Sequence, residues 1–275
     1  MEIAVPQKDA VIFGFDSAWT DKNPGAICAI SFDRQYHCKF YKPQPVNFDE
    51  AHMFIEETRR DHAFSLVAID QPTIVPNAKG MRPVERAAAT FMGGGVQPAN
   101  RSRTNMFGDG APIWGFLSES KAVQDPFQAR TANSGHFLIE VFPALALRAC
   151  FSQRKGAPKY DPEKKNFCNK DWQSVSCVVQ KKAEAFGIHD LAEWAKCAKC
   201  MSDRSPNKRD QDLLDSSICA LIGLIWRAAH PEASSMIGDT EKGYMVTPVS
   251  DRVRQRLESA AAKFGVSMRS TQSKS

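Results

Sequence analysis

Val11-Ile12-Phe13-Gly14-Phe15-Asp16 is the most informative stretch of the chain, because five apolar residues lead directly into a carboxylate. Such a run is typical of a buried strand. A buried carboxylate is costly when it has no partner. At the C-terminal end of a strand, Asp16 would face the crevice in which open α/β sheets bind ligands. The alternative is a turn-initiating Asp, since Ser17 follows it.

Two more acidic residues follow apolar runs. Asp70 ends Leu66-Val67-Ala68-Ile69, and Glu140 ends Phe137-Leu138-Ile139 and precedes Val141-Phe142. A Glu inside such a run needs either a cation or a basic side chain, and Arg148 is one candidate partner. If all three strands belong to one sheet, their carboxylates can converge.

The spacing of apolar residues and the positions of turn-forming residues predict the elements around these strands. The first part reads as βββαβ, with strands at 10–16, 25–32 and 36–42, a helix at 48–61 and a strand at 65–70. Further elements are helices at 83–92, 112–123, 173–186, 189–199 and 210–229, a strand at 136–142, a hairpin at 236–248 and a helix at 250–264. This order predicts an α/β protein.

The chain has no repeat and no clear linker, so the simplest division is one domain. We expect it to span 1–265, with insertions at about 72–135 and 152–205. The Lys- and Pro-rich stretch 152–170 is expected to be exposed, and the polar tail 266–275 to be disordered.

The helix at 210–229 adds two carboxylates near its start. Asp212 and Asp215 lie three residues apart and are therefore neighbours on the helix. Behind them Ser216, Cys219 and Gly223 form a stripe of small residues that would let the helix approach a sheet closely. The alternative is N-terminal capping and compensation of the helix dipole.

Clustered carboxylates repel one another unless a cation lies among them. Mg²⁺ and Mn²⁺ prefer such oxygen ligands. The sequence therefore predicts a metal site, and the expected ligands are Asp16, Asp70, Glu140, Asp212 and Asp215.

Five short motifs occur in an order that resembles the DUF429 family. They are Gly14-Phe15-Asp16-Ser17-Ala18-Trp19, Ala68-Ile69-Asp70-Gln71-Pro72, Ile139-Glu140-Val141-Phe142-Pro143, Asp212-Leu213-Leu214-Asp215-Ser216 and Gly238-Asp239-Thr240-Glu241-Lys242-Gly243-Tyr244. Ser216 stands where the family usually has Ala. That family is regarded as predicted nucleases with a ribonuclease H-like fold. The resemblance implies a mixed central sheet with helices on both faces, and a catalytic set of Asp16, Asp70, Glu140 and Asp215.

The chemistry implied is hydrolysis of a phosphodiester bond in nucleic acid by two metal ions. Asp16 would bridge both ions, Asp70 and Glu140 would hold one, and Asp215, with or without Asp212, the other. Four arginines are candidate substrate-binding residues, because Arg commonly contacts phosphate. They are Arg82, Arg86, Arg101 and Arg103. For the loop that holds Arg101 and Arg103, the alternative is an ordinary solvated loop.

Composition limits the class of protein. Lys+Arg 36 against Asp+Glu 31 gives a net charge of +5, which is compatible with nucleic acid but does not imply it. No apolar run is long enough for a membrane span, and the N-terminus does not resemble a signal peptide. We therefore expect a cytoplasmic protein with reduced thiols. Its oligomeric state is not indicated.

Cys197 and Cys200 form a C-x-x-C pair, with Cys168 and Cys177 upstream. Zn²⁺ at this pair is the weaker interpretation, because the step between Cys168 and Cys177 is not a zinc-knuckle spacing.

Two other functions stay open. A phosphotransferase of the sugar-kinase-like fold would share the Gly-x-Asp first strand and bind ATP, but no Gly-rich second phosphate loop follows Asp70. A non-catalytic module for nucleic acid or another ligand would gain nothing from an acidic cluster.

Overall fold

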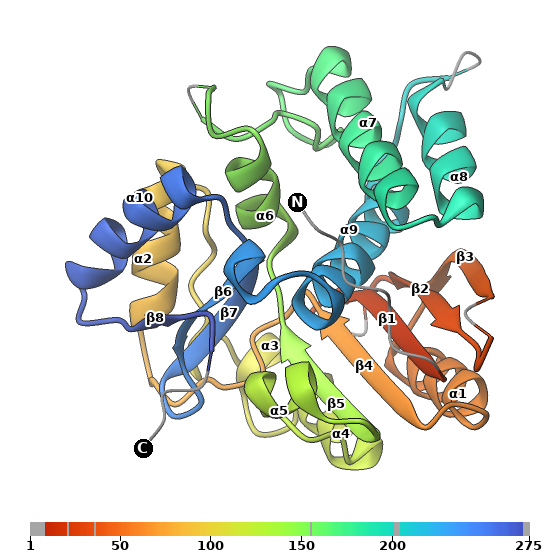
Figure 1. Cartoon of the computed structure of the whole chain (residues 1–275). Coiled ribbons are helices and arrows are strands. Elements are labelled where there is room, and N and C mark those ends of the chain that lie inside the picture. Colours follow the sequence, from red (N-terminus) through yellow and green to blue (C-terminus); the bar gives the residue numbers. More distant parts are fainter. Residues whose placement is uncertain (1–8, 21, 36, 155, 201–203, 272–275) are drawn as a thin grey trace.

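A mixed five-stranded sheet forms the centre of the molecule (Figure 1). The computed structural model describes residues 9–20, 22–35, 37–154, 156–200 and 204–271. The strand order is β3-β2-β1-β4-β5. β2 runs antiparallel to β1 and β3, whereas β4 is parallel to β1 and β5. The bounds are β1 Ala10–Asp16, β2 Gly25–Phe32, β3 Cys38–Val46, β4 Phe64–Ile69 and β5 Gly135–Glu140.

This arrangement confirms the α/β class and the mixed sheet, and it is compatible with a ribonuclease H-like fold. Helix α1 (Phe48–Arg59) connects β3 to β4, so the βββαβ order is confirmed. β3 continues through Pro43 and Pro45, beyond the expected end at residue 42. Proline is tolerated there because β3 is an edge strand and has a free side.

Helices cover both faces of the sheet. Phe13 and Phe15 of β1 point to the face that α1 and α4 (Pro112–Ser120) cover, and Phe15 packs against Phe48 and Phe116. Ile12 belongs to the core on the opposite face, beneath α9 (Lys208–Ala228). β1 is therefore buried on both sides, which explains its continuous apolar run.

Helix α9 crosses the sheet at very short range. A Cβ atom at Gly14 would collide with the backbone oxygen of Ser216 and the backbone nitrogen of Ala220. A Cβ at Gly223 would lie 3.0 Å from Cγ2 of Ile12. The expected close approach is thus present, and it requires a glycine in the strand as well as small residues on the helix.

The remaining elements lie around this core. Between β4 and β5 the chain forms α2 (Pro83–Met92), α3 (Thr104–Phe107), α4 and α5 (Pro126–Thr131). After β5 come α6 (Pro143–Cys150), α7 (Asn169–Ala185) and α8 (His189–Lys199). Figure 1 shows α7 and α8 as an antiparallel pair at one end of the molecule.

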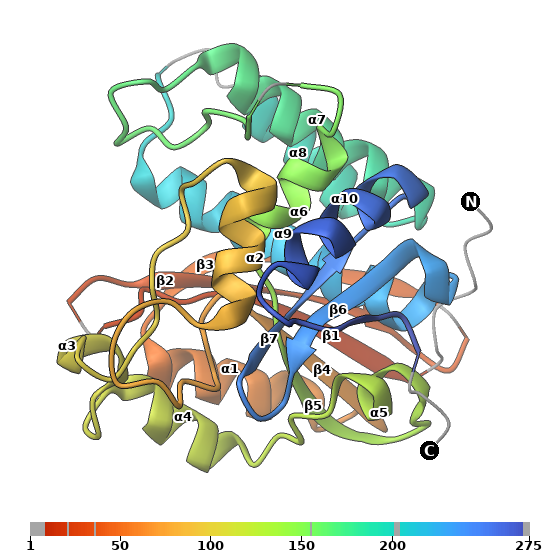
Figure 2. The same ribbon diagram turned by 90° about the vertical axis from the view of Figure 1, so that its left-hand side faces the viewer.

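A smaller sheet follows α9. After the 3-10 turn η1 (Pro231–Ala233), the chain forms β6 (Ser234–Asp239), β7 (Gly243–Pro248), α10 (Asp251–Ala262) and β8 (Met268–Arg269). The strand order is β7-β6-β8. Figure 2 shows α2 and α10 side by side over this sheet, and their contact surfaces form a separate apolar core.

The segment from residue 266 was expected to be disordered, but part of it forms a strand of the smaller sheet. Met268 and Arg269 pair antiparallel with Ile237 and Met236. The Ser270 hydroxyl also lies 3.0 Å from that of Ser235. Residues 272–275 lie outside the described part of the chain. Two residues of strand carry no periodic pattern, so the sequence could not reveal β8.

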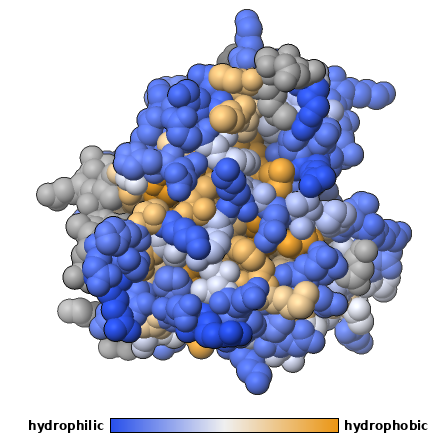
Figure 3. All heavy atoms as spheres, turned by 90° about the vertical axis from the view of Figure 1, so that its right-hand side faces the viewer, coloured by the Kyte–Doolittle hydropathy of each residue, from blue (hydrophilic) through white to orange (hydrophobic). Residues whose placement is uncertain are grey.

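The outer surface is predominantly polar. On the face in Figure 3, hydrophilic side chains cover most of the area, and hydrophobic ones lie between them. Among the described residues, the exposed large hydrophobic side chains are Met53 and Val123. They lie on α1 and in the segment before α5, so they do not form a patch with each other.

Candidate functional site

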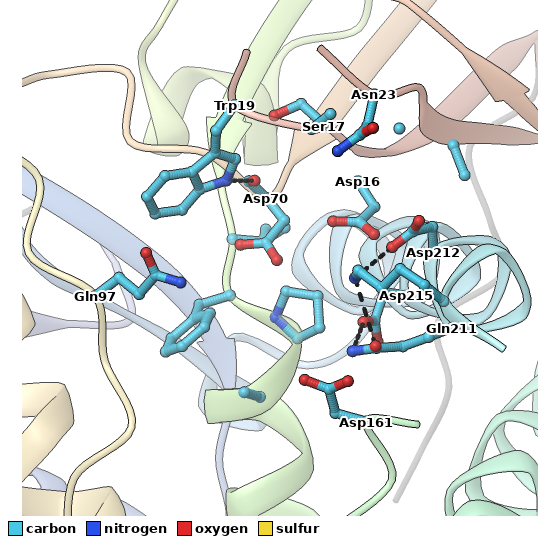
Figure 4. A pocket seen from close by; sticks show the side chains of 18 of the residues that line it. Asp16, Ser17, Trp19, Asn23, Asp70, Gln97, Asp161, Gln211, Asp212 and Asp215 are labelled. Atoms are coloured by element: carbon cyan, nitrogen blue, oxygen red, sulfur yellow. Dashed lines mark hydrogen bonds and ion pairs between the residues drawn. The ribbon is translucent and has the colours of Figure 1, made fainter. Parts of the chain in front are cut away.

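A cavity of about 900 Å³ opens at the C-terminal ends of β1 and β4. Its walls come from segments that are far apart in the sequence: the ends of these strands, the loop after α2, the segment around Tyr160 and the first turns of α9 (Figure 4). This is the position at which open α/β sheets bind ligands.

Five aspartates line this cavity, and we call four of them the aspartate cluster: Asp16, Asp70, Asp212 and Asp215. Asp16 is the last residue of β1. Asp70 follows β4, and its backbone N–H donates to the carbonyl of Phe15 at 2.8 Å. Figure 4 shows all four side chains around one space. The structure therefore brings together four of the five residues expected as metal ligands.

Burial and mutual repulsion change the acidity of the cluster. Burial, followed by the charge of Asp215, raises the pKa of both Asp16 and Asp70 well above the usual range. Burial raises the pKa of Asp215 to about 7. Desolvated carboxylates that face one another in this way favour either a proton or a cation.

Hydrogen bonds fix the side chain of Asp215. The hydroxyl of Tyr160 donates to Oδ1 at 2.7 Å, and Nε2 of Gln211 donates to Oδ2 at 3.2 Å. Both Asp215 oxygens are thus oriented by groups that carry no charge.

Lys208 supplies positive charge next to the cluster. Its ammonium donates to Oδ1 of Asp212 at 2.6 Å. Burial acts to lower the pKa of Lys208, but Asp16 and Asp212 outweigh it and raise the pKa above its usual value. One ammonium faces four carboxylates, so the cluster has an excess of acidic groups.

The capping alternative for Asp212 and Asp215 does not apply. Helix α9 begins at Lys208, and Asn207 is its N-cap. The side chain of Asn207 accepts from the N–H of Asp210 at 3.1 Å, and that of Asp210 accepts from the N–H of Asn207 at 2.8 Å. This capping box satisfies the start of the helix without Asp212 or Asp215.

The cluster fits a hard divalent cation by its chemistry, because its donors are carboxylate oxygens that repel one another. In the part of the chain that the structure describes, however, no group of three or more His, Cys, Asp or Glu residues is already arranged to hold an ion. Lys208 is bonded to Asp212, and Tyr160 to Asp215. An ion would therefore have to rearrange side chains that now bond to their neighbours.

Glu140 has a basic partner, which was the alternative to a cation. Both of its oxygens accept from the Arg82 guanidinium, at 2.6 and 2.9 Å, and Oε2 also accepts from the N–H of Thr73 at 3.2 Å. Burial raises the pKa of Glu140, while the paired Arg82 acts to lower it. The basic partner is Arg82 and not Arg148, whose guanidinium donates to the carbonyl of Phe151.

Arg82 also binds Glu85, and we call Arg82, Glu85 and Glu140 the Arg82 network. Nε of Arg82 donates to Oε1 of Glu85 at 2.9 Å, and Arg82 is 0% exposed. Arg82 was expected to bind substrate, but burial removes it from that role. Glu140 lines the cavity, but both of its oxygens are bonded to Arg82.

The Arg82 network explains part of the motif at 238–244. Gly243 has φ +99°, and a Cβ there would lie 2.7 Å from Nη1 of Arg82. The hydroxyl of the next residue, Tyr244, accepts from the N–H of Glu140 at 3.3 Å. The Gly-Tyr pair thus makes room for the guanidinium and supports the strand that carries its partner.

The other three candidate arginines do not reach the cavity. Arg86 is exposed on α2. Arg101 donates to the carbonyl of Val75 at 3.0 Å and stacks over Trp114, and Arg103 donates to the carbonyl of Pro98 at 2.9 Å. Their loop does contribute to the site, because Gln97 lines the cavity.

Several residues at the site were not predicted. Tyr160 lies in the stretch 152–170 that was expected to be exposed, yet it is buried. Its signal was weak, because it is one aromatic residue among Lys and Pro. Lys208 could have been found, since it lies four residues before Asp212 on one helix face. Lys164 and Arg209 also line the cavity.

Cys197 and Cys200 lie at the end of α8 and are exposed. All eight cysteines are free thiols in the structure. Within the described ranges, no third His, Cys, Asp or Glu joins this pair in a metal-binding group.

The sequence profile described as "Protein of unknown function (DUF429)" matches residues 14–242. The chain belongs to the DUF429 family. The match begins at the strand that carries Asp16 and ends in the turn before Gly243, so it includes the whole aspartate cluster of this DUF429 protein. Comparison with curated proteins and with solved structures gives no match. No helix in the described part of the DUF429 chain is long and apolar enough to cross a membrane.

Proposed function

We propose that this DUF429 protein is a Mg²⁺- or Mn²⁺-dependent nuclease that hydrolyses phosphodiester bonds in nucleic acid. The observation that carries the proposal is the aspartate cluster: carboxylates from β1, the end of β4 and α9 lie together at the ligand-binding edge of the sheet, with Asp16 and Asp215 buried and Asp70 half-buried. Such an arrangement is costly without a cation. It is also the donor set that two-metal phosphodiesterases use.

Asp16, Asp70 and Asp215 are the proposed ligands, and Asp212 is a fourth. Bound ions would neutralise the charge on the phosphate and lower the pKa of a water molecule. Tyr160 and Gln211 would hold the Asp215 carboxylate in a fixed orientation, since each bonds to one of its oxygens. Glu140 is left out of the ligand set because Arg82 occupies both of its oxygens.

The basic side chains of the cavity suit a polyanionic substrate. Lys164, Lys208 and Arg209 all line it, and they come from two segments of the chain, one around Tyr160 and one at the start of α9. Positive charge at this position would attract phosphate groups that the aspartates alone would repel.

The test is cleavage of labelled single- and double-stranded DNA and RNA oligonucleotides with Mg²⁺, with Mn²⁺ and with EDTA. We expect cleavage that needs the divalent ion and that falls at least 100-fold in Asp16→Asn and Asp215→Asn, in line with the loss of a metal-binding or charge-stabilising group. Both variants should remain folded by circular dichroism.

Asp161→Asn is the matched control. Asp161 lines the same cavity, but its Oδ1 accepts from the N–H of Glu163 at 3.0 Å and it lies outside the aspartate cluster. This variant should keep wild-type cleavage. Activity that survives in Asp16→Asn, or no cleavage of any of the four substrates with either ion, would refute the proposal.

A further inference from the structure

Trp19 has an unusual backbone conformation at the edge of the cavity. Its φ is +63°, a region that bulky side chains rarely adopt. The indole N–H donates to the backbone carbonyl of Asp70 at 2.9 Å (Figure 4). The ring is therefore held in a fixed position relative to a member of the aspartate cluster, at a cost in backbone strain.

Only part of the Trp19 indole is covered by protein. It packs against Phe107, with ring centroids 5.6 Å apart and an interplanar angle of 65°. It is nevertheless partly exposed, and it lines the cavity together with Gln97 and Met106. Trp114 of the same apolar cluster is also partly exposed, but Trp19 is the one of the two that lines the cavity.

The cavity has two chemically different sides. In Figure 4, Trp19 and Gln97 lie on one side of the aspartates, and Gln211 and Asp161 lie on the other. The basic residues Lys164, Lys208 and Arg209 belong to the segments that carry Asp161 and Gln211. The cavity thus offers an aromatic ring as well as basic side chains, of which Lys208 is bonded to Asp212 of the aspartate cluster.

We propose that Trp19 stacks on an unpaired nucleobase next to the scissile phosphate, so that the substrate of this site is a single-stranded or locally unpaired nucleic acid. This inference rests on the proposed nuclease function. Stacking on an aromatic side chain suits any base, because every base has a π face. A base inside a duplex has both faces covered by its neighbours, and it reaches a pocket only when it leaves the stack.

The size of the cavity agrees with this substrate. At about 900 Å³ it is within the range of pockets that enclose small ligands. It can take in a short stretch of one strand, whereas a duplex would have to lie across its mouth.

The experiment measures binding without cleavage. Fluorescein-labelled single-stranded DNA and RNA oligonucleotides, the matching duplex, and a single strand with one abasic position at each site in turn are titrated with protein in Ca²⁺. Fluorescence anisotropy gives Kd, and a gel verifies that the strands stay intact. The DNA and RNA arms decide which sugar the site accepts.

Wild-type protein should bind the single strand more tightly than the duplex. Trp19→Ala should weaken single-strand binding by about 5- to 150-fold, the range for loss of one base–aromatic stack. Trp19→Phe should retain most of the affinity, because it keeps a ring. One abasic position should weaken wild-type binding by a similar factor and should have no further effect in Trp19→Ala.

Trp114→Ala is the matched control. Trp114 packs in the same small apolar cluster, but it does not line the cavity. Trp114→Ala should lower the melting temperature, but one abasic position should still weaken oligonucleotide binding by the full wild-type factor. Equal abasic effects in wild type and Trp19→Ala would overturn the role of Trp19 even if the protein cleaves nucleic acid. Failure of every oligonucleotide to bind would overturn both this inference and the nuclease proposal.

Discussion

Asp70 and Glu140 stand at neighbouring strand ends of one sheet, where Ile69 of β4 is paired with Glu140 of β5. Glu140 is bonded through both oxygens to Arg82, which in turn binds Glu85. Asp70 faces Asp16 and Asp215, and no guanidinium of the described residues forms an ion pair with it. The Arg82 network thus has both of its carboxylates bonded to one buried guanidinium, whereas the four carboxylates of the aspartate cluster face one ammonium, that of Lys208. The difference separates a group that holds the fold together from one that is available to a ligand.

The largest effect should come from breaking the Arg82 network. Arg82→Met leaves Glu85 and Glu140 buried without their cation, and we expect the free energy of unfolding to fall by about 3–5 kcal/mol. Urea denaturation followed by circular dichroism measures this loss. Arg86→Met, on the exposed side of the same helix, should change it by less than about 0.5 kcal/mol. A loss under about 1 kcal/mol for Arg82→Met would show that the network is not structural.

The pH dependence of stability should reveal the aspartate cluster. The folded pKa of Asp215 is about 7, above its usual value of 3.8. At pH values between these two, Asp215 of the folded protein holds a proton that the unfolded chain has released. The resulting contribution to the free energy of unfolding is complete below about pH 4 and is lost as the pH rises through 7. Because the folded and unfolded pKa values differ by about three units, the free energy of unfolding of the metal-free protein should fall by up to about 4 kcal/mol over this pH range.

Asp215→Asn is the comparison for this measurement. Other carboxylates, such as Asp171 and Asp210, have lowered pKa values and act in the opposite direction. The difference between wild-type and Asp215→Asn unfolding curves, taken in EDTA from pH 4 to 8, gives the contribution of Asp215 together with its coupling to Asp16 and Asp70. A difference that does not change with pH would contradict the assignment.

Divalent ions should stabilise the aspartate cluster and not the Arg82 network. Mg²⁺ or Mn²⁺ at 100 times its Kd should stabilise the native protein by about 2.7 kcal/mol, seen as a rise in melting temperature. Asp16→Asn should abolish this rise. Glu140→Gln should lower the melting temperature yet keep the rise with Mg²⁺. If Glu140→Gln also loses the response, Glu140 is a ligand and the contrast between the two regions fails.

The smallest effect should come from removing one charge of the aspartate cluster. Asp70→Asn relieves repulsion, so the metal-free protein should be unchanged or more stable, by roughly 1 kcal/mol at pH 7. Thermal unfolding in EDTA provides the measurement. A loss of several kcal/mol would mean that Asp70, like Glu140, has a structural partner.

The sequence predicts β1, β2 and β4 well because these strands are buried on both faces. The run before Asp16 matches β1, and residues 25–32 match β2. Pro83 and the glycines after Met92 set the limits of α2 at the expected residues. The convergence of Asp16 and Asp70 follows from a general property of parallel strands, whose C-terminal ends meet at one edge.

The partners of these carboxylates could not be predicted in the same way. Arg82 reaches Glu140 only because the irregular chain after Asp70 turns back toward β5, and composition does not encode that path. Tyr160 reaches Asp215 from a stretch whose Lys and Pro content predicts exposure. Local patterns therefore identify where a buried charge lies, but tertiary structure decides whether it is paired.

The contact between Gly14 and α9 has a consequence for synthesis of the protein. The two sides of this contact, β1 and the backbone of Ser216, lie about 200 residues apart in the sequence. At translation rates of about 5–20 residues per second, the covering helix leaves the ribosome on the order of ten seconds or more after the strand. During that interval the apolar face of β1 that includes Ile12 has no helix to bury it. The nascent chain is therefore exposed to aggregation until α9 arrives, and the aspartate cluster assembles only at that late stage.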